Sequence, residues 1–568
     1  MKKIPILLCV VLLLSVVLSA AACRPDGVPT DELVVYNWAD YIYDYKDDFY
    51  AYYKELTGRN INVTYVTFDT NETMLTKIMQ GDAKVDVICP SEYAIQKLLE
   101  NDLLLPLNYF DEDKYAADMN VDSAKYVHNG GNVDRNVLGK IDEAFGAVTV
   151  AGQEKTRKMS DYMVPYMYGT LGILYNKYAF SDLGIYDYDV MNKANWGILF
   201  NDDGEGNLLS SGLTGNILMK DSIRDSYAAT LFYLKESGKL DGLTSTDESS
   251  PYYGKAYSEL SVGEFINAVD NQLINLCQDA LTSQKKQLFG YEVDFGKDDL
   301  LKGNAMADLA WSGDAMYAVE ESWSDYLCPE CISRTGVRKG DTVVCSECGG
   351  ECGDCELSYY VPHSAGNIWF DGWAIPKKTY NPEHLNAIKI FINFLNSPRV
   401  AAENMMEIGY SSAVDPEAVR GDDDARATLA RAYAVDCEYW DKKDENGADI
   451  TEFDYASWEE FEEYFFDGRD GMDNSNWRYP FVLSDDETRA LETLGVMRDF
   501  GVNNKAVVTM WNYARSTGDN ALPLLGWTVL AAAVAVGVIV LCEYVKRLRN
   551  SKVKIAQAST APSVPSDK

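Results

Sequence analysis

Between residues 33 and 100, apolar residues recur with two alternating periodicities, one typical of strands and one typical of helices. Short β-rich runs, LVVYNW at 33–38, NVTYVTF at 62–68 and VDVICPS at 85–91, predict strands. Each run is followed by a stretch whose apolar residues recur at helical spacing, and the first of these stretches ends at Gly58. Strands and helices in strict alternation predict a parallel sheet that is buried on both faces.

The loops that follow these three strands are candidates for ligand contact, because in such sheets ligands bind at the carboxyl ends of the strands. The loops read NWADY, FDTN and PSEY. The first and the third bring an aromatic side chain together with an acidic or hydroxyl side chain. Asn71, at the end of the second loop, is predicted to cap the next helix.

The same two periodicities recur later in the chain and are interrupted by two polar stretches. A strand pattern covers 162–176, a helical pattern covers 221–238, and NIWFDGWAIP at 367–376 predicts another strand. Two polar stretches, 111–160 and 420–476, lose this periodicity. The order of elements predicts an α/β protein. A chain of 568 residues is too long for a single core, so two or more lobes are expected.

The net charge of the chain limits the classes of molecule that it is suited to bind. With 88 acidic against 51 basic side chains, the formal net charge is −37. Such a chain does not suit nucleic acid, whose phosphates require Lys and Arg, whereas it attracts cationic ligands. A solvated acidic surface explains the same charge, so the charge alone does not choose a ligand.

The N-terminus has the pattern of an export signal. In MKKIPILLCVVLLLSVVLSAAAC, two lysines, an apolar run and small residues precede Cys23, which predicts a signal peptide over 1–22. The last four of these residues have two interpretations. They form either a lipoprotein box, with Cys23 as the lipidated residue, or an A-x-A cleavage site. Both interpretations place the body of the protein outside the cytoplasm.

An apolar stretch near the C-terminus predicts a membrane anchor. Residues 521–543 supply about the 20 residues that a membrane-spanning helix needs. The basic segment VKRLRNSKVK follows, and the positive-inside rule keeps it in the cytoplasm. The polar tail 551–568 is predicted to be disordered. We therefore expect an exported body that is tethered to a membrane.

Six motifs occur in one order along the chain: VVYNWADYI, TFDTNETMLTKI, VDVICPSEY, VPYMYGTLGILYN, DLAWSGDAMYA and IWFDGWAIP. In this order they resemble the spermidine/putrescine-binding proteins of polyamine ABC transporters, over residues 33–510. The resemblance implies a type II periplasmic-binding-protein fold, in which two α/β lobes joined by a hinge hold the ligand in the cleft between them. It assigns 33–166 and 366–512 to the first lobe and 167–365 to the second.

The resemblance also implies which side chains bind the ligand. These are Trp38, Asp40, Tyr41, Ser91, Tyr93, Asp225, Trp311, Asp314, Trp369, Asp371 and Tyr479. A polyamine is a chain of methylene groups between ammonium groups, so aromatic walls suit its body and carboxylates suit its charged groups. Ser222 stands where some relatives carry Asp, which leaves the preferred polyamine open. Taken singly, each residue has an ordinary structural explanation, such as core packing for Trp and Tyr or helix capping for Asp40.

Half of the chain's 12 cysteines lie in one segment, CPECISRTGVRKGDTVVCSECGGECGDC. They form three CxxC pairs: Cys328 and Cys331, Cys345 and Cys348, Cys352 and Cys355. The first two pairs have the spacing of a zinc ribbon, in which four thiolates form a tetrahedral site, and the third pair is able to replace either of them. Disulfides and a thiol-redox centre are the alternatives in an exported protein. Because two motifs that the family pattern nearly joins flank the segment, 326–358 is predicted to be an insertion in the second lobe.

The combined hypothesis is an extracytoplasmic substrate-binding protein that captures spermidine or putrescine and passes it to the permease of an ABC transporter. No enzymatic activity is expected. The binding function requires no cofactor, whereas the insertion is a candidate structural zinc site. One alternative is a binding protein of the same fold for another cationic or polar solute. The other is a zinc or thiol-redox protein that acts through the CxxC segment.

Overall fold

The computed structural model describes two ranges of the chain, 28–436 and 493–516, apart from a few positions inside the first range: 152, 154, 187–194, 249, 341 and 363. By its internal contacts the chain divides into the units Met1–Trp511 and Asn512–Lys568, and the fold and the cleft belong to the first unit. Several predictions fall outside the described residues: the signal peptide 1–22, Cys23, most of the second polar stretch, Tyr479, the span 521–543 and the tail 551–568. Within the described ranges, none of the helices combines the length and the apolar character that crossing a bilayer requires.

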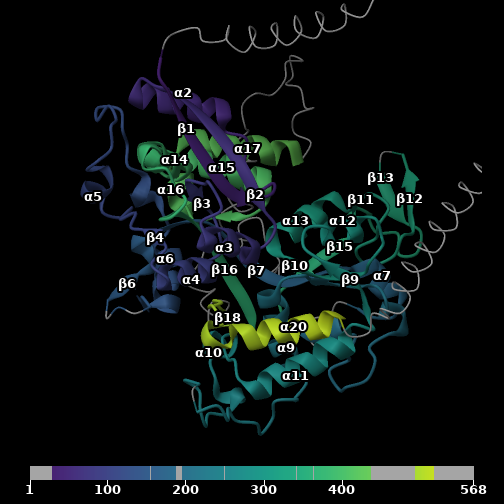
Figure 1. The fold of residues 1–568 in the computed structure, drawn as a ribbon. Helices are drawn as coiled ribbons and strands as arrows, with labels where there is room; N and C mark the ends of the chain where they lie inside the picture. The colour runs from purple at the N-terminus through teal and green to yellow at the C-terminus, as the bar shows by residue number, and fades with distance from the viewer. Residues whose placement is uncertain are drawn as a thin grey trace, which may run out of the picture. The chain divides into compact units, whose positions relative to one another are not determined.

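The predicted alternation of strands and helices forms one end of a sheet, which we call the first lobe (Figure 1). Its elements are β1 (Thr30–Trp38), α2 (Lys46–Thr57), β2 (Asn60–Phe68), α3 (Asn71–Gln80), β3 (Val87–Ile88) and α4 (Glu92–Glu100). β1 lies between β2 and β3 and runs parallel to both. Leu33 and Val35 pack into one core cluster and Tyr36 packs into another, so both faces of the strand are buried. The parallel arrangement predicted for this region is confirmed.

Two local predictions are wrong at the ends of these elements. The run at 85–91 is buried, but only Val87–Ile88 is a strand, because just two residues of β1 pair with it. Thr70 caps α3 in place of Asn71, since the Thr70 hydroxyl accepts a hydrogen bond from the backbone N–H of Thr73 at 3.2 Å. Asn71 is thereby free to use its side chain elsewhere.

The first polar stretch, 111–160, contains regular structure that its weak periodicity did not predict. The elements around it are β4 (Leu104–Leu105), α5 (Glu112–Ala116), η1 (Asn129–Asn132), α6 (Arg135–Phe145), β5 (Ala147–Thr149), β6 (Thr156–Lys158) and η2 (Met159–Asp161). α6 buries Val137, Leu138 and Ile141 on one face. The intervening Gly139 and charged residues obscure this spacing in the sequence.

The second lobe repeats the arrangement of the first. Its elements are α7 (Lys177–Asp182), η4 (Asn195–Phe200), η5 (Ser211–Leu213), β8 (Ile217–Lys220), α9 (Ile223–Glu236), η6 (Tyr257–Glu259), α10 (Val262–Phe265), α11 (Asn271–Gln284), β9 (Leu288–Glu292), α12 (Gly296–Leu301), β10 (Ala307–Trp311) and α13 (Ser312–Glu321). β8 lies between β9 and β10 and runs parallel to both, as β1 does between its neighbours.

Two long strands, β7 (Met163–Asn176) and β16 (Gly366–Pro376), join the lobes. They pair with each other in antiparallel orientation, and every residue of both strands is buried. β16 also pairs with β3, and β7 also pairs with β10. Most of the described strands thus form one sheet with the main order β2-β1-β3-β16-β7-β10-β8-β9, and each lobe ends on a crossing strand. Two α/β lobes joined by crossing strands are therefore present, as predicted.

The cysteine-rich segment lies between α13 and β16 and forms small strands of its own. These are β11 (Trp323–Ser324), β12 (Gly336–Lys339), β13 (Thr342–Cys345), β14 (Asp354–Cys355) and β15 (Leu357–Tyr360). β12 and β13 pair as a hairpin, visible at one side of Figure 1, and β11 pairs with β14. β15 returns to the main sheet beside β7. That 326–358 is an insertion in the second lobe stays a prediction.

The remaining elements follow β16. They are η7 (Pro382–His384), α14 (Leu385–Leu395), α15 (Pro398–Ile408), β17 (Ser411–Ser412), α16 (Pro416–Arg420), α17 (Asp423–Asp436), β18 (Leu494–Gly495), η11 (Gly501–Asn503) and α20 (Asn504–Ser516). The chain after β18 contacts the second lobe: Arg224 donates a hydrogen bond to the carbonyl oxygen of Arg498 at 3.0 Å, and Asn503 donates one to that of Val269 at 3.3 Å. The lobe boundaries at 166, 366 and 512 stay predictions.

Candidate functional site

The carboxyl ends of the parallel strands of both lobes border one cleft of about 620 Å³. This is the position at which α/β sheets bind ligands. The cleft brings together every predicted ligand residue that the structure describes: Trp38, Asp40, Tyr41, Ser91, Tyr93, Asp225, Trp311, Asp314, Trp369 and Asp371. Their roles in binding stay a prediction, and Tyr479 lies outside the described residues.

The wall of the first lobe begins with an aromatic pair. Trp38 is the last residue of β1 and Phe68 is the last residue of β2, and their ring centroids lie 4.5 Å apart. Both rings border the cleft, because parallel neighbours end at the same edge of the sheet. Asp40 follows in the turn after β1, with a φ of 48°, a conformation that Asp tolerates better than most residues.

Asn71 holds the other part of this wall in place. Its side-chain amide donates hydrogen bonds to the Ser91 hydroxyl and to the Tyr93 hydroxyl, each at 3.0 Å, and its oxygen accepts one from the Ser91 backbone N–H at 3.2 Å. The Tyr93 hydroxyl donates to the Glu72 carboxylate at 3.3 Å. The sequence interpretation missed Asn71 and Glu72 as site residues, although both follow a strand end.

The wall of the second lobe is built around Trp311 at the end of β10. Its ring centroid lies 6.4 Å from that of Trp38, so the two indoles meet from opposite lobes. The ammonium of the buried Lys220 lies 4.3 Å from the Trp311 ring centroid and is ion-paired with Glu292. This internal cation–π contact takes up part of the aromatic surface of Trp311 and holds the indole in position.

Two carboxylates of the second lobe are placed by helix starts. Ser222 caps α9, and its hydroxyl accepts a hydrogen bond from the backbone N–H of Asp225 at 3.4 Å. Asp314 lies in the first turn of α13, where a negative charge is favoured by the helix dipole. The Lys297 ammonium is 2.7 Å from an Asp314 carboxylate oxygen, so this carboxylate already has a partner.

The crossing strand β16 supplies the floor of the cleft. Trp369 pairs across the sheet with Gly169, where an added Cβ would stand 2.7 Å from the indole ring, so glycine is needed for the indole to lie there. A register shift follows Asp371, and this residue bridges to Ser91 of the first lobe. Such bulges redirect side chains near functional sites. Trp369 also packs against Tyr410, with ring centroids 5.3 Å apart.

The cleft is strongly acidic. Its acidic lining residues are Asp40, Asp69, Glu72, Glu92, Asp225, Asp294, Asp298, Asp314, Glu320, Asp371 and Glu407, and among the described lining residues Lys297 is the single Lys or Arg. Burial raises the pKa of Asp371 to about 7, and it also raises the pKa of Asp225 and that of Glu72. The positive charges near Asp225 and Glu72 do not fully compensate the burial of these two carboxylates, and no cation among the described residues is a cause of the shift in the pKa of Asp371.

Several buried polar atoms of the cleft have no hydrogen-bond partner among the described residues. Among them are the indole nitrogens of Trp38 and Trp369 and one carboxylate oxygen of Asp371. Buried polar atoms are nearly always paired in folded proteins, so unpaired ones that border a cleft are available to a ligand. The arrangement is able to bind an elongated cation with an apolar body.

Some lining residues could be predicted from the sequence and others could not. Asp294 and Lys297 follow the end of β9, so the rule that ligands bind at strand ends would have included them. Tyr410 follows the end of α15, and no pattern near it in the sequence indicates a binding site. It reaches the cleft only because α15 returns to the crossing strands.

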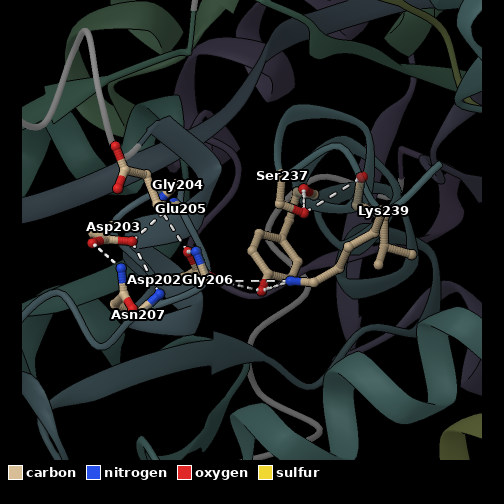
Figure 2. Close-up of polar contacts among 10 residues, drawn as sticks. Asp202, Asp203, Gly204, Glu205, Gly206, Asn207, Ser237 and Lys239 are labelled. Atoms are coloured by element: carbon tan, nitrogen blue, oxygen red, sulfur yellow. Dashed lines mark hydrogen bonds and ion pairs between the residues drawn. The ribbon is translucent and has the colours of Figure 1, made fainter. Parts of the chain in front are cut away.

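A second acidic group, in the loop 202–207, has partners within the loop and at Lys239 (Figure 2). Asp202 accepts hydrogen bonds from the backbone N–H groups of Gly204 and Gly206 at 2.9 and 3.1 Å, and its other oxygen lies 3.5 Å from the Lys239 ammonium. Asp203 is held in the same way by two backbone N–H groups. This loop therefore differs from the cleft, where one carboxylate oxygen of Asp371 has no partner among the described residues.

Comparison with known proteins agrees with this geometry. A family model described as bacterial extracellular solute-binding protein matches residues 48–432. The putrescine-binding periplasmic protein SpuD of Pseudomonas aeruginosa is 25% identical over 404 residues, which cover 69% of this chain and 82% of that protein. The putrescine-binding periplasmic protein PotF of Escherichia coli is 23% identical over 385 residues, 67% of this chain and 77% of its own.

A solved structure supports the fold. A protein described as a candidate spermidine/putrescine ABC transporter from Listeria monocytogenes superposes with a TM-score of 0.50 at 22% identity, over 86% of this chain and 99% of that one. At this identity the likeness concerns the fold, and it agrees with the two lobes and the crossing strands. The family match spans more than half of the chain and includes most of the cleft. The chain belongs to the bacterial extracellular solute-binding protein family.

Proposed function

We propose that the protein binds a polyamine, putrescine or spermidine, in the cleft between its lobes. The observation that carries this proposal is the composition of the cleft: opposed indoles and many carboxylates, with Lys297 as the single Lys or Arg among the described lining residues. Two relatives, SpuD and PotF, are putrescine-binding proteins, which favours the same ligand class.

The chemistry of a polyamine matches what the cleft lacks. Methylene groups pack against Trp38 and Trp311, and an ammonium near an indole face gains roughly 0.5–2 kcal/mol. Ammonium groups are strong donors, and the unpaired oxygen of Asp371 is a buried acceptor. A bound cation favours the ionised carboxylate and offsets the desolvation that raises the pKa of Asp371.

Delivery to a transporter follows from the same hypothesis. β7 and β16 are the hinge about which the two lobes close. The strand order is β2-β1-β3-β16 in the first lobe and β9-β8-β10-β7 in the second, which is a type II arrangement. The closed protein presents the polyamine to the permease of an ABC transporter on the outer side of the membrane. The signal peptide, a lipid on Cys23 and the span 521–543 would keep it there, and these remain predictions from the sequence.

Calorimetric titration of the full chain with putrescine and spermidine tests the proposal. Saturable binding of either polyamine supports it, and the absence of binding to both overturns it. Asp371→Asn is expected to lose affinity by roughly 30-fold or more, since loss of one member of a buried charged pair costs about 2–5 kcal/mol. Asp44→Asn is the matched control, because the Asp44 side chain is exposed and lies outside the cleft.

Lys297 favours one other candidate, a zwitterionic solute. A ligand that carries an acidic group beside its ammonium could pair with Lys297 and displace Asp314. Ornithine and putrescine separate the two candidates, because ornithine has the putrescine skeleton with one added carboxylate. Tighter binding of ornithine, lost on Lys297→Met, would favour the zwitterion. Tighter binding of putrescine favours the polyamine.

A further inference from the structure

The cysteine-rich insertion contains a cluster that the proposed binding function does not use. We call Cys328, Cys331, Cys345 and Cys348 the thiol cluster. Their four sulfur atoms all lie within 4.8 Å of one another. The sulfurs of Cys328 and Cys348 are 3.7 Å apart and those of Cys331 and Cys345 are 3.9 Å apart. In a tetrahedral zinc site with Zn–S bonds of about 2.3 Å, the sulfurs are about 3.8 Å apart.

Backbone donors surround the thiol cluster in the way that metal-bound thiolates require. The backbone N–H of Cys331 points at the sulfur of Cys328 at 3.4 Å, and that of Cys348 points at the sulfur of Cys345 at 3.5 Å. Gly350 donates to the sulfur of Cys348 at 3.4 Å. Each CxxC turn therefore directs N–H groups at its own sulfur atoms, and hydrogen bonds of this kind stabilise the thiolate form.

The residue after each of the two CxxC pairs of the thiol cluster adopts the same unusual backbone conformation. Gly349 has a φ of 77° and Ile332 has a φ of 45°. Glycine tolerates this region, but a β-branched residue there is strained by roughly 1–3 kcal/mol. Two equivalent turns, one of them strained, indicate that the four sulfurs converge on a common centre.

The insertion has few apolar residues with which to hold itself together. Between residues 326 and 358 the buried apolar residues are Leu327, Cys328, Val343, Cys345 and Leu357. So small a core does not offset the conformational entropy of ordering such a segment, and domains of this kind use a metal or disulfides instead. In the described structure the third pair, Cys352 and Cys355, lies outside the thiol cluster.

We propose that the thiol cluster binds one Zn²⁺ ion through four thiolates and that this ion holds the insertion in its fold. Each thiol gives up its proton when the metal binds. The four sulfurs all lie within 4.8 Å of one another, and the pairs Cys328–Cys348 and Cys331–Cys345 stand 3.7 and 3.9 Å apart, whereas two disulfides would draw them together in pairs at about 2.05 Å. The proposal does not rest on the proposed binding function.

The zinc site lies apart from the ligand cleft. None of the described residues from 321 to 368 lines the cleft. The insertion is attached to α7 of the second lobe: Asp354 is 2.8 Å from the Lys177 ammonium and accepts a hydrogen bond from the Tyr178 hydroxyl at 2.8 Å, and Arg334 lies 3.1 Å from Asp182. Loss of zinc is therefore expected to unfold the insertion and to leave the polyamine affinity within about threefold.

Metal analysis of the full chain tests the proposal. One zinc per chain is expected, together with the spectrum of tetrahedral thiolate coordination when Co²⁺ replaces Zn²⁺. Cys345→Ser with Cys348→Ser is expected to lose the metal, whereas the matched control, Cys352→Ser with Cys355→Ser, keeps it. If the first pair of substitutions prevents folding, the stoichiometry and the Co²⁺ spectrum of the unaltered chain still decide.

Three outcomes overturn the zinc proposal. The first is a metal-free chain whose thiols react only after reduction, which indicates disulfides. The second is iron in place of zinc. The third is loss of zinc from the Cys352→Ser with Cys355→Ser control. Titration of the same samples with putrescine tests the proposed polyamine binding separately from the zinc site. A chain that holds zinc but binds no polyamine would overturn only the proposed function.

Discussion

The Lys297 ammonium lies 2.7 Å from the Asp314 carboxylate inside the cleft. Asp314 is one of the acids expected to hold an ammonium of the ligand, so the protein supplies an ammonium of its own at that place. Lys297 follows the end of β9 and Asp314 follows the end of β10, and these strand ends border the same side of the cleft. A ligand that reaches Asp314 has to share this carboxylate with Lys297 or displace it.

Replacement of Lys297 by Met is predicted to strengthen polyamine binding. The substitution removes the internal competitor, so Asp314 becomes available to a ligand ammonium. Affinity for putrescine or spermidine should rise on the order of tenfold, which corresponds to about 1.4 kcal/mol. Calorimetric titration measures it. Lys255→Met is the control, because Lys255 forms an exposed ion pair with Glu264 and neither residue lines the cleft. Weaker polyamine binding by Lys297→Met would contradict the competitor role.

The raised pKa of Asp371 predicts opposite effects of pH on stability and on binding. The unperturbed pKa is 3.8 and burial raises it to about 7 in the folded protein. The folded state thus holds the proton more tightly. The contribution of Asp371 to stability is fully present below pH 3.8 and is lost as the pH rises through 7. Asp371→Asn should therefore be more stable than the unaltered protein above about pH 7, in denaturant titrations without ligand.

Binding should show the reverse trend, because an ammonium prefers the ionised carboxylate. Putrescine affinity is expected to increase between about pH 5 and pH 8, with release of a proton on binding at the lower end. Calorimetry in buffers with different ionisation enthalpies measures that proton. Affinity that falls over this range would show that the titration of Asp371 does not control binding.

Trp38 is predicted to contribute directly to ligand affinity. Trp38→Leu keeps an apolar side chain but removes the π face, so putrescine affinity should fall by roughly 2- to 30-fold. Trp323→Leu is the matched control, since Trp323 is 58% exposed and does not line the cleft. Equal effects of the two substitutions on binding would exclude a specific role for Trp38.

Gly313 is predicted to be required for close approach of the lobes. A Cβ at this position would stand 2.4 Å from the ring of Tyr410, which reaches α13 from the other side of the cleft. Gly313→Ala should therefore hold the lobes apart and weaken polyamine binding, while the fold persists. Small-angle scattering with and without putrescine measures closure. Gly139→Ala in α6, where an added Cβ meets nothing within 4 Å, should close normally.

Lys220 is predicted to stabilise the second lobe. It is buried and ion-paired with Glu292. Burial lowers the pKa of Lys220, but the charges of Glu292 and Asp308 raise it by more. Lys220→Met would leave buried carboxylates without their cation and should reduce the free energy of unfolding by about 3–5 kcal/mol, measured by chemical denaturation. Lys114→Met, which breaks an exposed pair with Asp111, should cost less than about 1 kcal/mol.

Much of the fold could be predicted because its signals are local. β1, β2 and α2 follow from residues that are adjacent in sequence, and their periodicity survives any tertiary context. The length of β3 could not be predicted, because it depends on how many residues of β1 remain available to pair. The helix α6 could not be predicted for a related reason. Its row of buried residues is short, and the elements that pack against the helix decide which residues are buried.

The candidate site shows the same division. Trp38, Ser91 and Trp311 stand at strand ends or helix starts, so local pattern and family resemblance together were enough to propose them. Tyr410 comes from a segment whose own sequence carries no sign of the site. Its contribution arises from contacts between residues far apart in the chain.

By itself the sequence determined the alternation of strands and helices, the acidic and aromatic character of the loops at strand ends, and the spacing of the CxxC pairs. These properties depend on residues within a few positions of one another, and the chain carries them in any conformation. The tertiary structure alone decided that two sets of loops border one cleft, that Lys297 forms an ion pair with Asp314, and that the sulfur atoms of four of the six clustered cysteines converge. The physical reason is that the crossing strands β7 and β16 and the hairpin of β12 and β13 bring distant residues together, and charge pairing and metal coordination act only over a few ångströms.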